Sequence, residues 1–401
     1  MGSGFRAAAF FLFLANPLPY QPGLAKIELG LAYLCGMHLQ QIKLTNFRNY
    51  EFQSVDFSDR LNLIAGLNGM GKTNLLDAVY YLCMGKSHFQ STDKNVVRRG
   101  EPFFRLEGIF HLEKPEKIVA KVVPGEQKNL ERNDNTYPRI SDHVGLLPVV
   151  FMAPDDAALL LEGSEERRRF MDNTLCQLDH QYLETLVVYN RLLEKRNALL
   201  RQFSVQGSFN ELLLETFDHQ LESSAKLVFE KRKWFIGLFQ PVFNEFYAKI
   251  SQEAEGVDCS YRSQLEQAPL TELLSKNLEK DRLLLRTSVG IHKDDMAFHL
   301  KSFPLKRFAS QGQLKSFVLA MKLAQYQLLR QQKLKKPILL LDDLFDKLDD
   351  HRASQLIELL VKDDFGQVFI TDTHPLRAEE LANRFGATYK KLIVEHGSMV
   401  L

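Results

Sequence analysis

The chain has 401 residues, of which 45% are hydrophobic and 25% are charged, and its formal net charge is +1. This is an ordinary soluble globular composition, and the chain is long enough for one large core or two smaller ones. The near-zero charge excludes a uniformly basic chain, so a DNA-binding protein of this composition must concentrate its cations on one face. The four cysteines lie far apart without metal-ligand spacing, which predicts reduced thiols in a cytoplasmic protein.

The first 36 residues differ from the rest of the chain. A short apolar run, Phe10–Leu14, precedes three prolines and is too short to span a bilayer. A signal peptide is the alternative, but no small-x-small cleavage site follows the run. We therefore expect no membrane segment, and we interpret residues 1–36 as an N-terminal extension that is either disordered or the product of an over-extended start. The folded part is expected to begin at Met37.

Residues 37–154 have the pattern of an α/β domain. Short apolar or alternating segments predict strands, and one segment after a glycine-rich loop predicts a helix. The predicted strands cover residues 38–44, 50–57, 61–65, 103–111 and 117–123, and the helix covers 72–84.

Residues 155–285 change character. Apolar residues fall at helical spacing from about 165 to 202, and again from Leu214 to Val228 in a second long helix that should end or kink before Pro241. These two helices predict an all-helical lobe inserted into the α/β domain. The α/β pattern returns in 286–401, with strands at 338–341 and 367–370. We therefore predict a mostly parallel sheet assembled from 37–154 and 286–401.

One segment between a predicted strand and a predicted helix fits the pattern G-x-x-x-x-G-K-[ST]. Glycines at these positions let backbone amides approach phosphates, the lysine reaches the β- and γ-phosphates, and the hydroxyl binds Mg²⁺. The alternative is a chance match, which the strand-loop-helix context disfavours. We predict that the segment and the residue after it bind ATP: Gly66, Leu67, Asn68, Gly69, Met70, Gly71, Lys72, Thr73 and Asn74.

The apolar strand at 338–341 ends in two carboxylates, Asp342 and Asp343. Asp342 is predicted to bind Mg²⁺ together with Thr73, and Asp343 is predicted to position or activate the attacking water. The alternative is a pair of aspartates that cap the next helix.

Two further segments are candidates for the nucleotide site. Ser310, Gly312 and Gln313 precede or open a predicted helix, where a hydroxyl, a glycine and a helix N-terminus could contact a γ-phosphate on another subunit. The same residues also fit a simple capping box, and the two interpretations do not exclude each other. His374 follows the strand at 367–370 and is a candidate catalytic residue near the γ-phosphate, although a histidine before proline is more often a turn residue.

Two basic runs, Arg167–Arg169 and Lys231–Lys233, lie on the predicted helical lobe. They are hypotheses for DNA contact, and the alternative is that each is a solvated helix face.

In this order and spacing, the motifs resemble the RecF family of bacterial recombination-repair proteins, which is related to the SMC branch of the ABC-type ATPases. The resemblance begins with Phe47-Arg48-Asn49-Tyr50 and includes the P-loop, with Asp77 where the family usually has Glu. It continues through the arginine run at 167–169, the loop at 290–295, where Ile291 and Lys293 depart from the family's Gly-Pro-His-Arg-Asp-Asp, and the segments at Ser310, at 341–349 and at His374.

The resemblance implies an ABC-type P-loop ATPase domain with an inserted helical lobe. It implies slow ATP hydrolysis, an ATP-dependent homodimer that opens and releases DNA on hydrolysis, and a role in recombinational repair, replication and the SOS response to DNA damage. The implied partners are DNA, at single-strand/double-strand junctions, and RecR, with RecO as a further candidate. ATP and Mg²⁺ are the implied cofactors. Asp346 and Asp349 would lie at the dimer interface or be solvated. The glutamine of an ABC Q-loop has no counterpart in 149–157.

Other classes remain as alternatives. An SMC-like ATPase of another DNA-maintenance or defence system would share the motifs, but such chains usually carry a nuclease domain for which no length remains. The nucleotide subunit of a transporter is disfavoured by the long helical insertion and by the form of the signature. A P-loop kinase is disfavoured by the paired aspartates together with a signature in trans.

Overall fold

The computed structural model describes residues 36–90, 92–251, 256–301, 303–343, 349–363 and 365–400. All of them fall within one structural unit, Cys35–Leu401. The expected extension therefore lies outside the described residues except for Gly36, and so do Asp346 and the rest of 344–348.

A six-stranded sheet, which we call the parallel sheet, carries the strand predicted before the glycine-rich loop. Its order is β15-β14-β3-β13-β12-β8, and every neighbouring pair is parallel except β14 and β15. Every residue of β3, β8, β12 and β13 is buried, as expected for strands covered on both faces. The strands are β3 (Leu61–Ala65), β8 (Val149–Met152), β12 (Ile338–Leu341), β13 (Val368–Asp372), β14 (Tyr389–Glu395) and β15 (Ser398–Val400). The mostly parallel sheet built from both chain ends is confirmed.

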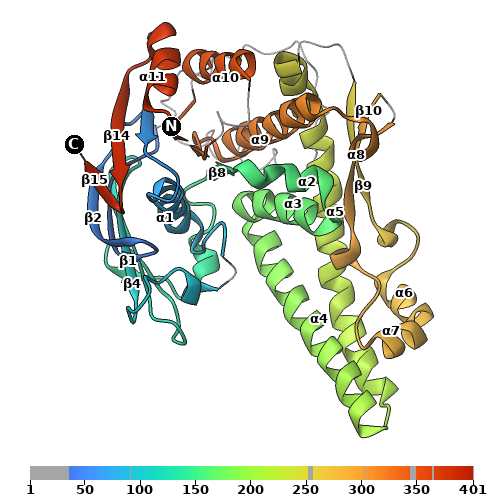
Figure 1. Cartoon of the computed structure of the whole chain (residues 1–401). Coiled ribbons are helices and arrows are strands. Elements are labelled where there is room, and N and C mark those ends of the chain that lie inside the picture. The colour runs from blue at the N-terminus through green and yellow to red at the C-terminus, as the bar shows by residue number, and fades with distance from the viewer. Residues whose placement is uncertain are drawn as a thin grey trace, which may run out of the picture. The chain divides into compact units, whose positions relative to one another are not determined.

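A second six-stranded sheet is antiparallel, with the order β2-β1-β4-β5-β6-β7. Several of its segments were predicted as extended, but their pairing was not. Helix α1 (Lys72–Met84) packs between the two sheets within one apolar core (Figure 1). The strands are β1 (His38–Phe47), β2 (Tyr50–Asp56), β4 (Phe104–His111), β5 (Pro115–Val122), β6 (Asn129–Arg132) and β7 (Asn135–Thr136), with 3₁₀ helices η1 (Asp93–Asn95) and η2 (Ile140–Asp142).

The region between β8 and β12 is mainly helical. It also contains β9 (Val257–Arg262), which pairs with β10 (Asp295–Leu300), so the expectation of an all-helical lobe over 155–285 is wrong on this point. Strand β11 (Phe303–Pro304) completes the small sheet. The helices are η3 (Pro154–Ala157), α2 (Ala158–Leu161), α3 (Ser164–Leu178), α4 (His180–Gln206), α5 (Glu211–Ser251), η4 (Gln264–Glu266), α6 (Leu270–Lys276), α7 (Leu278–Leu284), η5 (Ile291–Lys293), α8 (Leu305–Phe308) and α9 (Gln311–Lys333).

Of the two predicted outcomes at Pro241, an end or a kink of the helix, the end is wrong, because α5 continues through Pro241 to Ser251. Pro241 has no N–H to donate to the preceding turn. Buried aromatic rings of α5 stack on either side of this point: Phe235 on Phe239 at 5.3 Å, and Phe239 on Phe243 at 5.5 Å between centroids. Their burial against α9 offsets the lost hydrogen bond.

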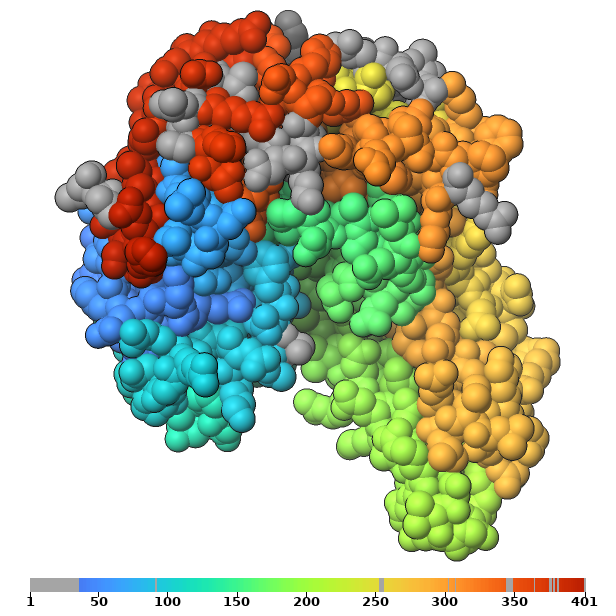
Figure 2. Space-filling view, in the orientation of Figure 1, coloured from blue at the N-terminus to red at the C-terminus, as the bar shows by residue number. Residues whose placement is uncertain are grey.

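Helices α10 (Asp350–Lys362) and α11 (Pro375–Arg384) complete the fold. One core joins the helical region to a face of the parallel sheet, and another fills the space around α1. Figure 2 shows the surface hollowed between the antiparallel sheet, in cyan, and α4, in light green. No helix in the described ranges has the length and apolar content needed to cross a membrane.

Candidate nucleotide site

The glycine-rich loop connects β3 to α1 and has a backbone that only glycine suits at two points. Gly71 has φ +119°, and a Cβ there would lie 2.7 Å from the Asn49 amide nitrogen. Gly66 would bring a Cβ to 2.4 Å from the Val394 carbonyl oxygen. At these two points the loop lies too close to its neighbours to carry a side chain, so only glycine fits. A loop backbone without side chains also lets its amides approach a phosphate.

The Lys72 ammonium lies inside this loop. Its Nζ donates hydrogen bonds to the carbonyl oxygens of Gly66, at 2.8 Å, and Leu67, at 3.3 Å, and lies 3.6 Å from Asp343 Oδ1. The side chain is buried. The loop thus holds one positive charge at the N-terminus of α1, where the helix dipole also favours an anion.

The turn between β1 and β2 braces the loop from outside. Asn49 donates to the Met70 carbonyl at 2.9 Å and accepts from Asn74 at 2.7 Å. The Tyr50 hydroxyl donates to the Gly71 carbonyl at 3.0 Å. The sequence analysis identified this turn as part of the family resemblance, but it did not predict a contact between the turn and the loop.

The same turn is anchored to α1 by an ion pair. Arg48 lies 2.6 Å from the buried Asp77 carboxylate, which also accepts from the Ser87 hydroxyl and the His88 amide. The carboxylate at this position thus ties the turn and the segment after α1 to the helix.

Asp342, at the end of β12, lies next to the loop, as predicted. Its Oδ1 accepts from the Thr73 hydroxyl at 3.0 Å and from the Thr371 hydroxyl at 2.8 Å. Burial raises the pKa of Asp342 to about 6, which the two hydroxyls and Lys72 partly oppose. Thr371, on β13, was not identified from the sequence.

Thr73 and Asp342 fit a divalent metal. A hydroxyl and a carboxylate are oxygen ligands of the kind that Mg²⁺ prefers, and a buried carboxylate with a raised pKa gains from a nearby cation. The chemistry of this pair therefore agrees with the predicted metal role.

Asp343 has an unusual backbone. Its φ is +39°, in the left-handed region, and its N–H donates to the Thr371 hydroxyl at 2.8 Å. A non-glycine residue in this region costs about 1–3 kcal/mol and tends to occur at functional sites. The Asp343 carboxylate lies near Lys72. It does not cap α10, since the N-cap of that helix is Asp349.

Ser310 is the N-cap of α9, and the capping box is confirmed. The Gln313 amide donates to the Ser310 hydroxyl at 3.2 Å, and the Ser310 amide donates to Gln313 Oε1 at 2.8 Å. Ser310 is exposed at this helix N-terminus. Gly312 lies under Arg352 of α10, whose guanidinium would be 3.3 Å from an added Cβ.

His374 is exposed just after β13. Its amide donates to Asp372 Oδ1 at 2.9 Å, and the Asp372 carbonyl accepts from the Gly66 amide at 3.3 Å. The structure thus places the His374 segment beside the start of the loop.

A buried lysine connects α9 to the parallel sheet. Lys322 donates to the Phe151 carbonyl of β8 at 2.7 Å and pairs with Asp156 at 2.8 Å. Phe151 and Asp156 both lie in residues 149–157, the segment in which the sequence has no Q-loop glutamine. A lysine within an otherwise apolar helix face was the available signal for this contact.

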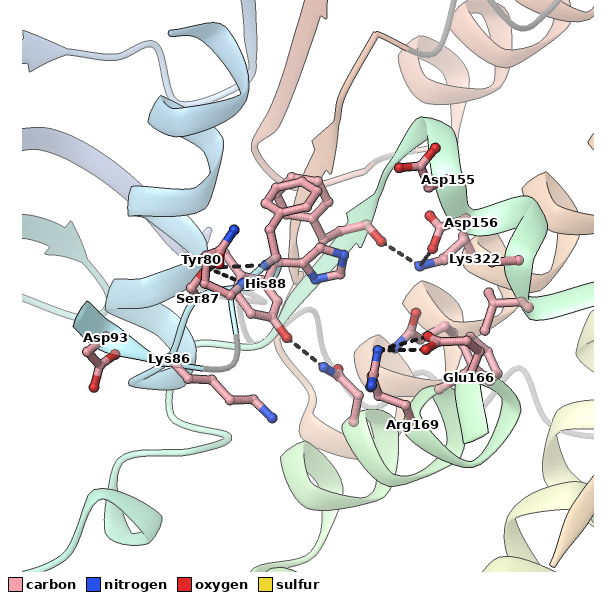
Figure 3. Close-up of a pocket in the computed structure, with 18 of the residues that line it drawn as sticks. Tyr80, Lys86, Ser87, His88, Asp93, Asp155, Asp156, Glu166, Arg169 and Lys322 are labelled. Atoms are coloured by element: carbon pink, nitrogen blue, oxygen red, sulfur yellow. Dashed lines mark hydrogen bonds and ion pairs between the residues drawn. The ribbon is translucent and has the colours of Figure 1, made fainter. Parts of the chain in front are cut away.

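A cavity of about 400 Å³ lies beside this contact but contains none of the loop residues (Figure 3). Lys86, His88, Arg169 and Lys322 line it together with Asp156. His88 stacks on Phe151, and burial with nearby cations lowers the pKa of His88 to about 3.

Most cations of the two basic runs are engaged in ion pairs, whereas Arg168 and the exposed Lys233 form none within the described residues. Arg167 pairs with Asp295 at 2.7 Å, and Arg169 pairs with Glu165 and Glu166. Arg232 is buried and pairs with Asp172 and Asp294, both at 2.9 Å, and Lys231 pairs with Asp179. Neither the DNA-contact hypothesis nor a solvated helix face describes Arg232, which is part of the core.

The fold and the site define an ATPase of the ABC-type P-loop class. The family model described as RecF/RecN/SMC N terminal domain matches residues 38–393. The chain is 44% identical over 357 residues to the DNA replication and repair protein RecF of Flavobacterium johnsoniae, covering 88% of this chain and 99% of that protein. It is 41% identical to the RecF of Bacteroides thetaiotaomicron, covering 90% and 98%.

Solved structures agree with this class. A structure of the recombination mediator protein RecF with ATP, in the RecFOR pathway, superposes with a TM-score of 0.82 at 28% identity, covering 92% of this chain and 98% of that one. A Smc head domain from Pyrococcus furiosus has a TM-score of 0.51 at 16% identity, covering 90% and 95%, and shows the fold alone. The chain belongs to the RecF family of DNA replication and repair proteins.

Proposed function

We propose that this chain is an ATP-gated DNA clamp of recombinational repair. Two copies close around two ATP molecules, bind DNA at single-strand/double-strand junctions and help to load recombinase at gaps. RecR is the first candidate partner and RecO the second, in the cytoplasm. The relatives named as DNA replication and repair proteins, and the RecF structures with ATP in the RecFOR pathway, support this proposal.

The observation that carries the proposal is the contact between the glycine-rich loop and the strand-end carboxylates. Thr73 meets Asp342 at 3.0 Å, and Lys72 lies 3.6 Å from Asp343. Lys72 binds the β- and γ-phosphates, and Thr73 and Asp342 hold Mg²⁺, which when bound neutralises phosphate charge. Asp343 orients the attacking water, and the strained backbone fixes its carboxylate for this task.

The second half of each site comes from the other copy. Figure 1 shows α1 well separated from the junction of α8 and α9, where Ser310 lies. The exposed helix N-terminus of α9 is therefore free to meet the γ-phosphate bound by a second chain. Its backbone amides and the Ser310 hydroxyl supply the contact.

Sedimentation with ATP, with ADP and without nucleotide tests the dimer. We expect dimers with ATP alone, and Ser310→Arg should remain monomeric because a bulky charge blocks the approach of the second chain. Ser310→Thr keeps a capping hydroxyl and is the matched control. ATP affinity of the monomer should be the same in both variants.

DNA affinity is measured on the same proteins with a junction substrate. Wild type and Ser310→Thr should bind DNA more tightly with ATP than with ADP, whereas Ser310→Arg should show no difference. Equal DNA affinities for all proteins and nucleotides would leave an ATPase that is not a clamp.

A further inference from the structure

Backbone contacts bring four cations together between α7, β10 and α3. Arg168 of α3 donates to the carbonyl of Asp294, which follows Lys293, the His292 ring bonds the carbonyl of Thr287, which follows Arg286, and the Arg286 amide donates to the carbonyl of Asp281, which follows Lys280. We call the four cations the basic cluster: Lys280, Arg286, Lys293 and Arg168. The first three are exposed and Arg168 is half-buried. Figure 2 shows the orange segment around residues 285–300 at the surface, beside the green of α3. The cluster is distinct from the two basic runs apart from Arg168.

The cations of the cluster act on one another. Burial and the charges of Arg286, Arg168 and Lys280 hold the pKa of Lys293 below its ordinary value. Within the described part of the chain, Lys280, Arg286 and Lys293 form no ion pair. Asp281 offsets part of this repulsion at Lys293, but the pKa of Lys293 still lies below its ordinary value.

The carboxylates of the same neighbourhood form their ion pairs with other arginines. The pairs are Asp281 with Arg196 at 2.8 Å, Asp294 with Arg232 at 2.9 Å, Asp295 with Arg167 at 2.7 Å, Glu279 with Arg282 at 2.8 Å and Glu165 with Arg169 at 3.3 Å. Arg196, Arg232 and Arg169 each pair with a second carboxylate as well, namely Asp218, Asp172 and Glu166. In the described residues, none of these carboxylates forms an ion pair with Lys280, Arg286 or Lys293, so these three exposed cations have no carboxylate partner of their own.

Arg168 is fixed in place without being neutralised. Its guanidinium donates to the Ser164 hydroxyl at 2.6 Å and to the Asp294 carbonyl at 2.7 Å, and both acceptors are uncharged. An arginine held in this way keeps its charge and loses little conformational entropy when it binds an anion. The cluster therefore combines one preorganised cation with three exposed ones.

We propose that the basic cluster binds the phosphate backbone of DNA. Sequence-independent DNA binding requires cations that can each replace a counterion, and internally paired arginines cannot do so. Most cations of the runs at 167–169 and 231–233 form ion pairs within the chain. The cations of the basic cluster form none in the described residues. The inference rests on the proposed function, because it presumes that the chain binds DNA.

The test uses the full chain with ATP and a fluorescent DNA junction. Arg286→Glu/Lys293→Glu removes two cations, and anisotropy is recorded between 50 and 200 mM salt. Each lost phosphate contact should weaken binding by about tenfold near 0.1 M salt and lower the slope of log affinity against log salt by about 0.9. For two lost contacts we therefore expect binding weaker by about a hundredfold near 0.1 M salt and a slope smaller by about 2.

The matched control is Lys249→Glu/Lys362→Glu, which changes the net charge equally. Both lysines are exposed, and each is already paired with a glutamate on its own helix. This control should bind DNA as wild type does. Circular dichroism and ATP binding report folding, and Arg286→Gln/Lys293→Gln is used if the reversal unfolds the protein.

The outcomes separate the two proposals. If wild type binds DNA and the cluster variant matches it in affinity and slope, the cluster is not a DNA surface, although the chain remains a clamp. If the control variant lost as much DNA affinity as the cluster variant, the effect would come from net charge alone, and the assignment of the cluster would be overturned. If wild type with ATP does not bind DNA, the proposed function itself fails.

Discussion

Replacing Thr371 by Val tests whether its hydroxyl organises the two strand-end carboxylates. The hydroxyl donates to Asp342 at 2.8 Å and accepts from the Asp343 amide at 2.8 Å, and Thr371 is fully buried. Valine has nearly the same shape but no hydroxyl, so both partners lose a hydrogen bond while the packing is kept.

The expected cost follows from those two bonds. Leaving a buried polar group unsatisfied costs about 1–3 kcal/mol, and the half-buried Asp343 amide should lie at the low end of this range. We expect the free energy of unfolding to fall by about 2–4 kcal/mol. Asp343 also loses the anchor of its strained backbone, and a barrier higher by about 1.4 kcal/mol slows turnover tenfold.

Urea unfolding, ATP turnover at saturating ATP and ATP affinity are measured together. We expect lower stability, turnover at least about tenfold slower and nearly unchanged ATP affinity, because Lys72 keeps its contacts. Thr174→Val is the control, since Thr174 is also fully buried and its hydroxyl bonds Phe170 and Gln325. It should destabilise the protein without slowing turnover. Wild-type turnover in Thr371→Val, or an equal loss in the control, would refute the reasoning.

Three further predictions concern the same chain. Lys72→Ala should leave the protein folded but abolish nucleotide binding or contact with the γ-phosphate, which titration with ATP would detect; wild-type affinity would contradict the assignment. Asp343→Asn should bind ATP yet hydrolyse it slowly and accumulate as a dimer in sedimentation, and a wild-type rate would give the water-orienting role to another residue. Arg232→Gln should lower the free energy of unfolding by about 3–5 kcal/mol because it leaves a buried carboxylate unpaired, whereas Lys233→Gln should change it by less than about 0.5 kcal/mol. Equal effects in urea unfolding would show that Arg232 is not a core residue.

The glycine-rich loop could be predicted because its determinants are local. A buried strand, spaced glycines and a helix start lie within one short segment, and β12 delivers Asp342 at its end in the same way. The contact between Thr73 and Asp342 joins residues 269 positions apart, so it followed only from the pattern of parallel strands. The glycine motif and the predicted parallel sheet together were sufficient.

The braces around the loop could not be predicted, because nothing in the local sequence indicates their partners. Thr371 looks like any strand threonine until β13 pairs with β12, and Asn49 looks like a turn residue until the turn meets the loop. The antiparallel sheet was hidden for the same reason. Alternation predicts a strand in 104–110 but does not identify its neighbours.

Arg232 was misread because a run of like charges was considered without the phase of its helix. Val228, Arg232, Phe235 and Phe239 are spaced at i, i+4, i+7 and i+11, which places the arginine on the apolar face of α5. An arginine at such a position needs buried acceptors, and Asp172 and Asp294 supply them. The helical period thus contained the signal.

The two halves of the proposed site are linked through one strand. Helix α9 begins at Ser310 and carries Lys322, which bonds the end of β8 through the Phe151 carbonyl. The next residue of β8, Met152, accepts from the Asp342 amide at 2.9 Å. Because Lys322 and Asp156 are both largely buried, separating them is costly, and α9 and β8 must move together. In the proposed dimer, a second chain that contacts Ser310 would therefore act, through helix α9 and one backbone bond, on the strand end that positions Asp342.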